Sequence, residues 1–390
     1  MRMTVGLEMT RCRGFCVAAA VFMLTLAAHG SCALGQAPAD AGATEAPPPV
    51  MAKQYNEYRP AELPSPAKIR VLRSEIMAVL RLGTFENDDQ KKKFNDYYKY
   101  RIAEMTWAEN LHDLPKKRGD LKKQDLKMAS TAPEKQVHEQ LNQLLLAATG
   151  NFAGDASYHP AVRLNMVLLL GMLDQQEPDG LGLNNIPLPA ALDRLIALLG
   201  DPKQLDAVRV GAMIGIDRHA RQPMQPPARS AVVKALTSPL NFANPAAAAL
   251  VRHRAVITLG MMAAKWPEAN RPEVVALMQQ VLADPEATLL ARCDAARALG
   301  SVEKSAFAGA AVQQLASTAG LLAAELGKSA TDPNMKFVDE KNSLQPLTSQ
   351  LLCVHMGLKG TDANHGLASA APNNETKQFI TELAGKVNQL

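Results

Sequence analysis

The sequence predicts an all-α fold built from pairs of short helices that stack on one another. Two observations carry this prediction. Between residues 162 and 300 one motif recurs four times: an Arg follows a small apolar residue, and a Gly or Asp stands eight residues after the Arg. Apolar runs that end at a Leu and lead into a Pro-containing turn precede three of the four copies. The repeating unit is therefore a helix, a tight turn and a second helix.

The second helix of each unit is defined by its Arg, which we number as position zero. The four residues are Arg163, Arg209, Arg252 and Arg292. Positions −1, +3, +4 and +7 are apolar in every copy, and they lie on one face of a helix with about 3.6 residues per turn. Gly at +8, present in three copies, is typical of a left-handed cap. We therefore expect each second helix to end there.

The turns before three of the copies place Asp or Ser directly before Pro: Asp201-Pro202, Ser238-Pro239 and Asp284-Pro285. This dipeptide is typical of an N-cap followed by Pro in the first helical turn. We therefore expect a new helix to begin at each of these sites.

The copies resemble HEAT repeats in their Asp-Pro, Val-Arg and Leu-Gly elements and in a spacing of roughly 40–47 residues. The resemblance implies an α-solenoid of about five HEAT-like helix pairs, of the HEAT/armadillo class that includes PBS-lyase-HEAT-like proteins. In that family Asp and Arg side chains bond between neighbouring repeats as a ladder. By resemblance the ladder here is structural and consists of Arg163, Asp201, Arg209, Arg252, Asp284 and Arg292. Ser238, Asp217 and a longer turn at 240–249 depart from the pattern.

The N-terminal segment, residues 1–35, has the pattern of a secretory signal peptide. Arg2, Arg11 and Arg13 precede an apolar core at 16–28, which is shorter than the roughly 20 residues that span a bilayer. We expect an exported protein, periplasmic or secreted, with no transmembrane segment after cleavage. Retention as an anchor and lipidation at Cys32 are the alternatives. Residues 36–66 are rich in Ala and Pro, without periodicity, and predict a disordered linker.

The remaining chain divides into three predicted parts. Residues 67–131 form an N-terminal helical region, with helices at 67–82 and 90–111 and a Lys-rich loop or frayed helix at 115–131. Residues 133–360 form the HEAT-like repeat array, with a surface loop at 174–189. Residues 361–390 are a linker followed by a helix at 375–390, which either caps the array or docks onto a partner.

Neither the composition nor the motifs indicate a nucleic-acid, cofactor, metal or catalytic site. The formal net charge of +4 is too small to indicate a surface that binds nucleic acid. The haem, zinc-helix, phosphate-loop and nucleophile-elbow motifs are absent, and no two His residues lie three or four positions apart. Cys293 and Cys353, the cysteines outside the signal, are expected to be buried free thiols. We expect no cofactor, no metal and no catalysis, so the chain is not expected to be an enzyme.

The remaining candidate is the ridge formed by the second helices. Positions +2 and +5 are expected to face away from the packed stripe, with the end of the second copy beside them. These positions predict a partner-binding surface made of Asn165, Arg218, His219, Arg254, Asp294 and Arg297.

Three functions remain open. The first is an exported scaffold or adaptor that binds a protein partner without catalysis. The second is an envelope-associated module that binds anionic lipid or polysaccharide through the Lys-rich stretches 91–93 and 116–127. The third is a lyase or cofactor protein, since some HEAT-like proteins that this chain resembles act as bilin lyases.

Overall fold

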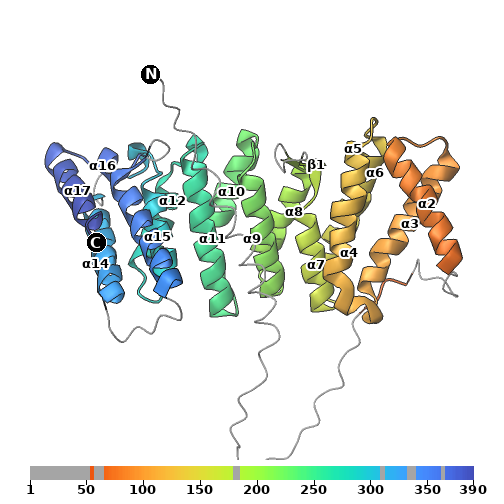
Figure 1. The fold of residues 1–390 in the computed structure, drawn as a ribbon, viewed down its shortest axis with the longest axis horizontal. Helices are drawn as coiled ribbons and strands as arrows, with labels where there is room; N and C mark the ends of the chain where they lie inside the picture. The colour runs from red at the N-terminus through yellow and green to blue at the C-terminus, as the bar shows by residue number, and fades with distance from the viewer. Residues whose placement is uncertain (1–52, 57–65, 179–184, 308–311, 332–339, 362–364) are drawn as a thin grey trace, which may run out of the picture. The chain divides into compact units, whose positions relative to one another are not determined.

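Helices form nearly all of the regular structure in the described part of the chain (Figure 1). The computed structural model describes residues 53–56, 66–178, 185–307, 312–331, 340–361 and 365–390. Ala52–Leu390 forms one compact unit. The predicted all-α fold is confirmed. The predicted signal peptide (1–35) and nearly all of the predicted linker (36–66) lie outside the described residues.

The N-terminal region is mostly helical. Its segments are α2 (Pro66–Leu82), α3 (Asp88–Ala103), the 3-10 turns η2 (Glu104–Thr106) and η3 (Ala108–Asp113), α4 (Leu114–Asp120), the π-helical η4 (Leu121–Leu126) and α5 (Lys127–Thr131). The sequence predicted a helix at 90–111. The observed helix, α3, ends earlier, at Ala103. The rings of Phe94 and Tyr98 are fully buried, with centroids 4.7 Å apart.

The expectation of a loop or frayed helix at 115–131 was wrong. Segments α4, η4 and α5 follow one another without a break. Leu114, Leu121 and Leu126 in this stretch are fully buried. The π-helical turn η4 accommodates an extra residue relative to an α-helix, which keeps Leu121 and Leu126 on the buried side although they are five positions apart.

Ten helices downstream alternate as first and second members of pairs. The first helices are α6 (Gln136–Gly154), α8 (Pro189–Gly200), α10 (Pro226–Thr237), α12 (Pro272–Ala283) and α14 (Val312–Thr331). The second helices are α7 (Pro160–Leu170), α9 (Asp206–Ala220), α11 (Pro245–Ala263), α13 (Leu289–Leu299) and α15 (Glu340–Lys359). Short 3-10 turns, η5 (Pro267–Ala269) and η6 (Lys304–Phe307), lie in two of the connections.

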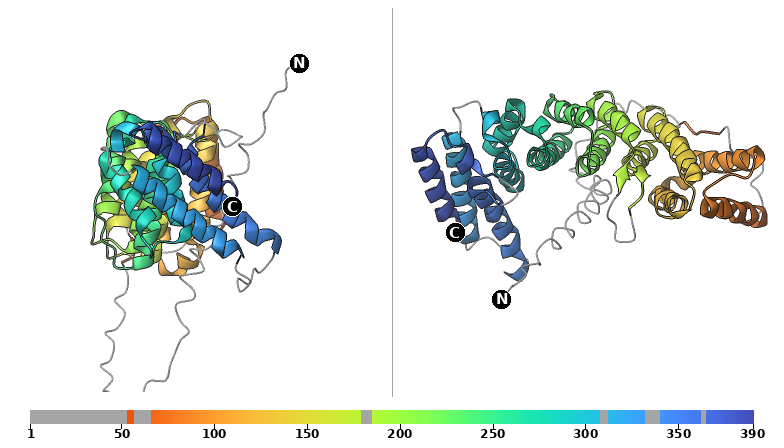
Figure 2. Two further views of the ribbon diagram at one scale, coloured as in Figure 1. Left: turned by 90° about the vertical axis from the view of Figure 1, so that its left-hand side faces the viewer. Right: turned by 90° about the horizontal axis from the view of Figure 1, so that it is seen from above.

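The second helices pack on one another in chain order, from α7 through α9, α11 and α13 to α15. The first helices pack in the parallel order α6, α8, α10, α12 and α14. Figure 1 shows α7, α9 and α11 side by side, and the view from above in Figure 2 shows helices of this region in two rows. In all four copies the residues at −1, +3, +4 and +7 are buried. Their burial between the rows removes apolar surface from water and stabilises the pairs.

The glycines at +8 do not adopt the left-handed cap that we predicted. Gly171 and Gly300 have φ of −66°. Among the described residues the positive-φ glycines lie at other positions. The repeat glycines instead allow neighbouring helices to touch. A β-carbon on Gly171 would lie 2.8 Å from the Cα of Gly215, and one on Gly300 would lie 2.5 Å from the carbonyl oxygen of Gly357.

The Asp-Pro turns do not start helices, contrary to the expectation. The Asp201 carboxylate accepts from the Lys203 backbone N–H within the turn, and α9 begins only at Asp206. Asp284 behaves in the same way, and α13 begins at Leu289. The N-cap of α13 is Thr288, whose hydroxyl accepts from the backbone N–H of Ala291 at 3.2 Å.

The C-terminal part contains α16 (Leu367–Ala370) and α17 (Asn374–Val387). Helix α17 packs on α14 and α15, with Ile380, Ala384 and Val387 buried. Within the described residues, α11 is the one helix long and apolar enough to cross a membrane. This is weak evidence, because core helices of globular proteins pass the same test.

Candidate functional site

Each repeat Arg joins its own helix pair to the next pair, at a turn in the first three copies and at helix α14 in the fourth. In three copies the Arg Nε donates to the carbonyl ten residues earlier: Arg163 to Ala153 at 3.2 Å, Arg209 to Leu199 at 2.9 Å and Arg292 to Leu282 at 3.3 Å. The Nη atoms reach forward: Arg163 to Gln204, Arg209 to the Asn241 carbonyl, Arg252 to Asp284 and Arg292 to Glu325. These contacts tie consecutive pairs together.

The two Asp residues of the expected ladder take different parts in this arrangement. Arg252 Nη1 lies 3.3 Å from Asp284 Oδ2, which makes a direct pair between repeats. Asp201 instead accepts from the Gln204 side chain at 2.9 Å, and Gln204 accepts from Arg163 at 2.5 Å. An amide therefore stands between the carboxylate and the guanidinium in that repeat.

Position +2 turns toward a neighbouring helix rather than outward. Arg118 on α4 donates to buried Asn165 at 2.6 Å. Arg254 lies 3.5 Å from Asp217 on α9. Asp294 lies 2.8 Å from His253 Nε2 on α11. The structure therefore places these three predicted binding residues in contacts between helices.

The end of α9 is also engaged inside the protein. Arg218 Nη2 lies 2.5 and 2.6 Å from the two carboxylate oxygens of Asp174. His219 is buried, and this burial, with the neighbouring Arg218 charge, lowers its pKa to about 4. Arg297, at +5 of the fourth copy, is exposed. Of the six predicted partner-binding residues, Arg297 is therefore the one with an exposed side chain.

Asp174 is the centre of a buried charge cluster that the sequence did not reveal. Its side chain is fully buried and lies 2.7 Å from Lys122 Nζ on η4. Lys122 also lies 2.6 Å from Glu177 Oε1. With Arg218, whose side chain is 28% exposed, the two cations balance the two carboxylates. The cluster ties the N-terminal region to α9.

A small hairpin positions these acidic residues. Strand β1 (Asp174–Gln176) pairs antiparallel with β2 (Ile186–Pro187). The Asn142 side chain on α6 donates to the backbone carbonyl of Asp174 at 2.9 Å. The prediction of a surface loop at 174–189 was therefore wrong at its first residue, because Asp174 serves as the partner of two cations.

The Lys-rich stretch 116–127 uses most of its charge internally. Its engaged side chains are Lys117 with Glu104, Arg118 with Asn165, Lys122 with Asp174 and Lys127 with the carbonyl of Pro178. Lys116 and Lys123 are exposed. This arrangement lowers the charge that the stretch presents to an anionic surface.

An apolar surface runs along the second helices, which we name the outward face. It consists of positions −2 and +5 of α7, α9, α11 and α13: Ala161, Leu168, Ala207, Ile214, Leu250, Ile257, Leu290 and Arg297. None of these side chains is buried, and Ile214, Leu250 and Leu290 are 38%, 37% and 45% exposed. Positions −2 and +5 are two helical turns apart, so they share one side of a helix.

Two further kinds of reactive group bear on a site in the described part of the chain, metal-ligand clusters and cysteine thiols. No group of three His, Cys, Asp or Glu residues there could hold a metal ion. Cys293 and Cys353 are free. Burial raises the pKa of the Cys293 thiol to about 12 and also raises that of Cys353. Both thiols are therefore protonated and weakly nucleophilic at neutral pH.

Comparisons with known proteins give little beyond the fold. No family model matches the chain, and no curated protein matches it. A solved structure of human deoxyhypusine hydroxylase in complex with glycerol is similar, with 16% identity and a TM-score of 0.23, over 74% of this chain and 99% of that one. This likeness is compatible with a HEAT-like helical fold but is too low to carry an argument about function.

The expectation that the chain is not an enzyme is contradicted by this comparison. The similar protein is a hydroxylase and therefore an enzyme. Our expectation rested on the absence of motifs that belong to other folds, and such an absence does not exclude catalysis in a helical protein. The likeness does not establish catalysis in this chain either.

Proposed function

We propose that this protein is an exported HEAT-like solenoid that binds a protein partner on its outward face. The observation that carries the proposal is the apolar character of that face. On a helix whose opposite side is already packed, the outer positions are normally polar. Here seven of the eight outward-face residues are apolar, on four successive helices.

The flanks of the outward face support the same proposal. Charged side chains beside it are paired between helices, as in Arg254 with Asp217 and His253 with Asp294. These pairs leave the apolar strip flanked by polar groups. Apolar patches rimmed by polar residues mark interaction sites, and interface centres are depleted of unpaired charge.

The test is photocrosslinking in the exporting cell. A photoreactive amino acid at Leu250 or Leu290 is expected to capture one protein, because both side chains are exposed on the face. The matched control is Val71 on α2, which is 60% exposed but lies outside the face. The double substitution L250E and L290E is expected to weaken capture at Ile214 by roughly tenfold or more.

Two results would overturn the proposal. Equal crosslinking at Val71 and at the two face positions would show that capture reflects exposure alone. Unchanged capture in the double variant, with an unchanged thermal melt, would show that the apolar side chains do not contribute to binding.

A further inference from the structure

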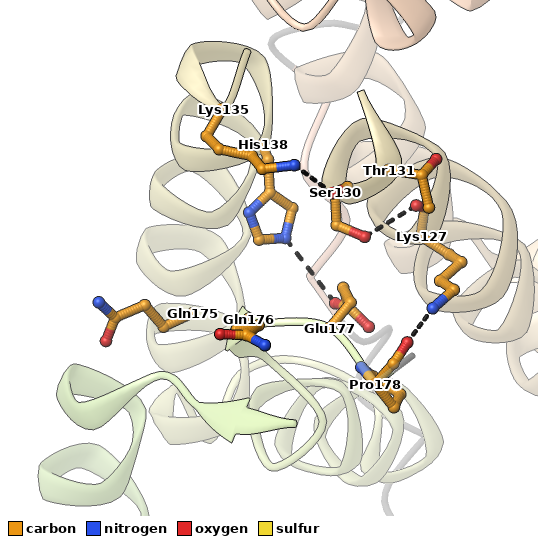
Figure 3. A pocket seen from close by; sticks show the side chains of 9 residues that line it. All are labelled: Lys127, Ser130, Thr131, Lys135, His138, Gln175, Gln176, Glu177 and Pro178. Atoms are coloured by element: carbon orange, nitrogen blue, oxygen red, sulfur yellow. Dashed lines mark hydrogen bonds and ion pairs between the residues drawn. The ribbon is translucent and has the colours of Figure 1, made fainter. Parts of the chain in front are cut away.

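A pocket of about 410 Å³ lies beside the buried charge cluster, away from the second-helix residues that form the outward face. Helix α5, the start of α6, strand β1 and the two residues that follow it supply its walls (Figure 3). Its volume falls at the lower end of the range of roughly 300–1,000 Å³ that small-molecule sites occupy. The pocket is therefore of a size for one small ligand.

Two ammonium groups are held in fixed positions at this pocket. Lys135 Nζ donates to the carbonyls of Ser130 and Ala132 at 2.6 and 2.7 Å. Lys127 Nζ donates to the carbonyl of Pro178 on the other side. An ammonium has three N–H donors, so Lys135 has one beyond these bonds and Lys127 has two. Each can donate to a ligand without giving up its carbonyls.

The carboxylate that lines the pocket does not cancel this charge. Glu177 lies 2.6 Å from Lys122 Nζ, and Lys122 and Arg218 together balance Glu177 and Asp174. The lining therefore carries an excess of positive charge from Lys127 and Lys135. A positive pocket with pre-positioned N–H donors favours an oxyanion.

Other polar groups complete the lining. The hydroxyl of Ser130 donates to the Lys127 carbonyl and that of Thr131 to the Met128 carbonyl. Each hydroxyl oxygen therefore has lone pairs that can accept from a ligand hydroxyl. His138, only 2% exposed, forms part of the floor beside Glu177.

We propose that this pocket binds a small oxyanion that also carries hydroxyl groups, an acidic sugar unit, with its anionic group between Lys127 and Lys135. A uronic acid and a sugar phosphate share this chemistry. The site is independent of the outward face, so its failure and that of the partner-binding proposal are distinguishable.

The test is calorimetric titration of the full chain with D-glucuronate, glucose 6-phosphate and D-glucose. We expect one or both anions to bind and glucose not to bind, and the tighter anion identifies the oxyanion type. K127Q and K135Q are each expected to weaken binding roughly tenfold or more, because each removes a charge-assisted hydrogen bond. K123Q is the matched control, because Lys123 is exposed in the same helical segment and lies outside the pocket.

The fold of each variant is checked by its thermal melt. If a Lys variant does not fold, T131V takes its place, since it removes one lining hydroxyl and keeps both charges. Absence of binding by both anions at about 10 mM would overturn the proposal. So would equal binding of glucose, or an equal loss in K123Q.

Discussion

The junction between the N-terminal region and the first helix pairs differs from the junctions between later pairs. The first is held by enclosed charges, in which Lys122 and Arg218 meet Asp174. The later junctions are held by close helix contact at small residues, as between Gly300 and Gly357. Their ion pairs include a carboxylate with several partners, as in Asp217, which pairs with Arg254 and with Arg221.

The two kinds of junction are expected to respond differently to substitution. In an enclosed cluster, removal of one charge leaves its partners unpaired in a medium of low dielectric. Where a carboxylate has several partners, as Asp217 has in Arg221 and Thr258, the remaining partners still stabilise it when one cation is removed. At a glycine contact, the added volume of one methyl group is what destabilises the junction, and charge does not contribute.

The largest expected effect is at Asp174. The substitution D174N keeps the shape and removes the charge that Lys122 and Arg218 share. We expect the free energy of unfolding to fall by about 3–5 kcal/mol, measured by urea denaturation. D89N is the control, since Asp89 is exposed in an i,i+4 pair with Lys93, and little or no loss is expected. Similar losses in both variants would remove the distinction between the junctions.

Next in size is the pH dependence that His219 contributes beside this cluster. Burial lowers its pKa in the folded state to about 4, against an ordinary value of 6.5. The unfolded chain therefore binds a proton first as the pH falls. Stability from this group is complete above pH 6.5, falls between pH 6.5 and 4, and changes no further below pH 4. The total loss is about 3 kcal/mol.

Urea denaturation at pH 7.5 and pH 4.5 measures this effect. H219Q is expected to remove that part of the slope, because Gln does not titrate. The same slope in H219Q and in the parent chain would assign the pH dependence to other groups.

A glycine substitution tests the later junctions. G300A places a methyl group 2.5 Å from the backbone oxygen of Gly357, where only movement of the helices makes room. We expect a loss of about 1–3 kcal/mol in unfolding free energy. G119A in α4 is the matched control, because nothing lies within 4 Å of the added methyl group. That variant is expected to gain about 0.5–1 kcal/mol, so a loss there would contradict the packing argument.

The smallest effect is expected at Arg254, because its partner Asp217 has other partners. R254A leaves Asp217 with Arg221 at 3.0 Å and with the Thr258 hydroxyl at 2.8 Å. We expect a loss below about 1 kcal/mol, and a smaller one at about 1 M salt. A loss above about 2 kcal/mol that persists in high salt would place this pair with the enclosed cluster.

Local pattern predicted the repeat helices well. The apolar positions around each repeat Arg are all buried, because a 3.6-residue period is legible in a short window of sequence. The same search missed the helical stretch at 115–131. Its buried Leu121 and Leu126 are five positions apart, a spacing that only the π-helical turn between them accommodates.

The candidate sites were much less predictable. Asp174 lies in an insert with no periodic signal, and its partners Lys122 and Arg218 are 52 and 44 residues away in sequence. Position +2 was predicted to face outward because a single helix was considered. With its neighbours in place, Asn165, Arg254 and Asp294 face adjacent helices.

The amino-acid sequence is sufficient to establish the repeat helices, their pairing and the recurring Arg and Gly, since each depends on residues within a few turns of one another. What the recurring Arg and Gly residues contact is decided by the packing of the helices. Whether a Gly caps a helix or admits its neighbour, and whether Arg254 meets solvent or Asp217, depends on which surfaces are brought together. Those contacts join residues dozens of positions apart, and no local pattern encodes them.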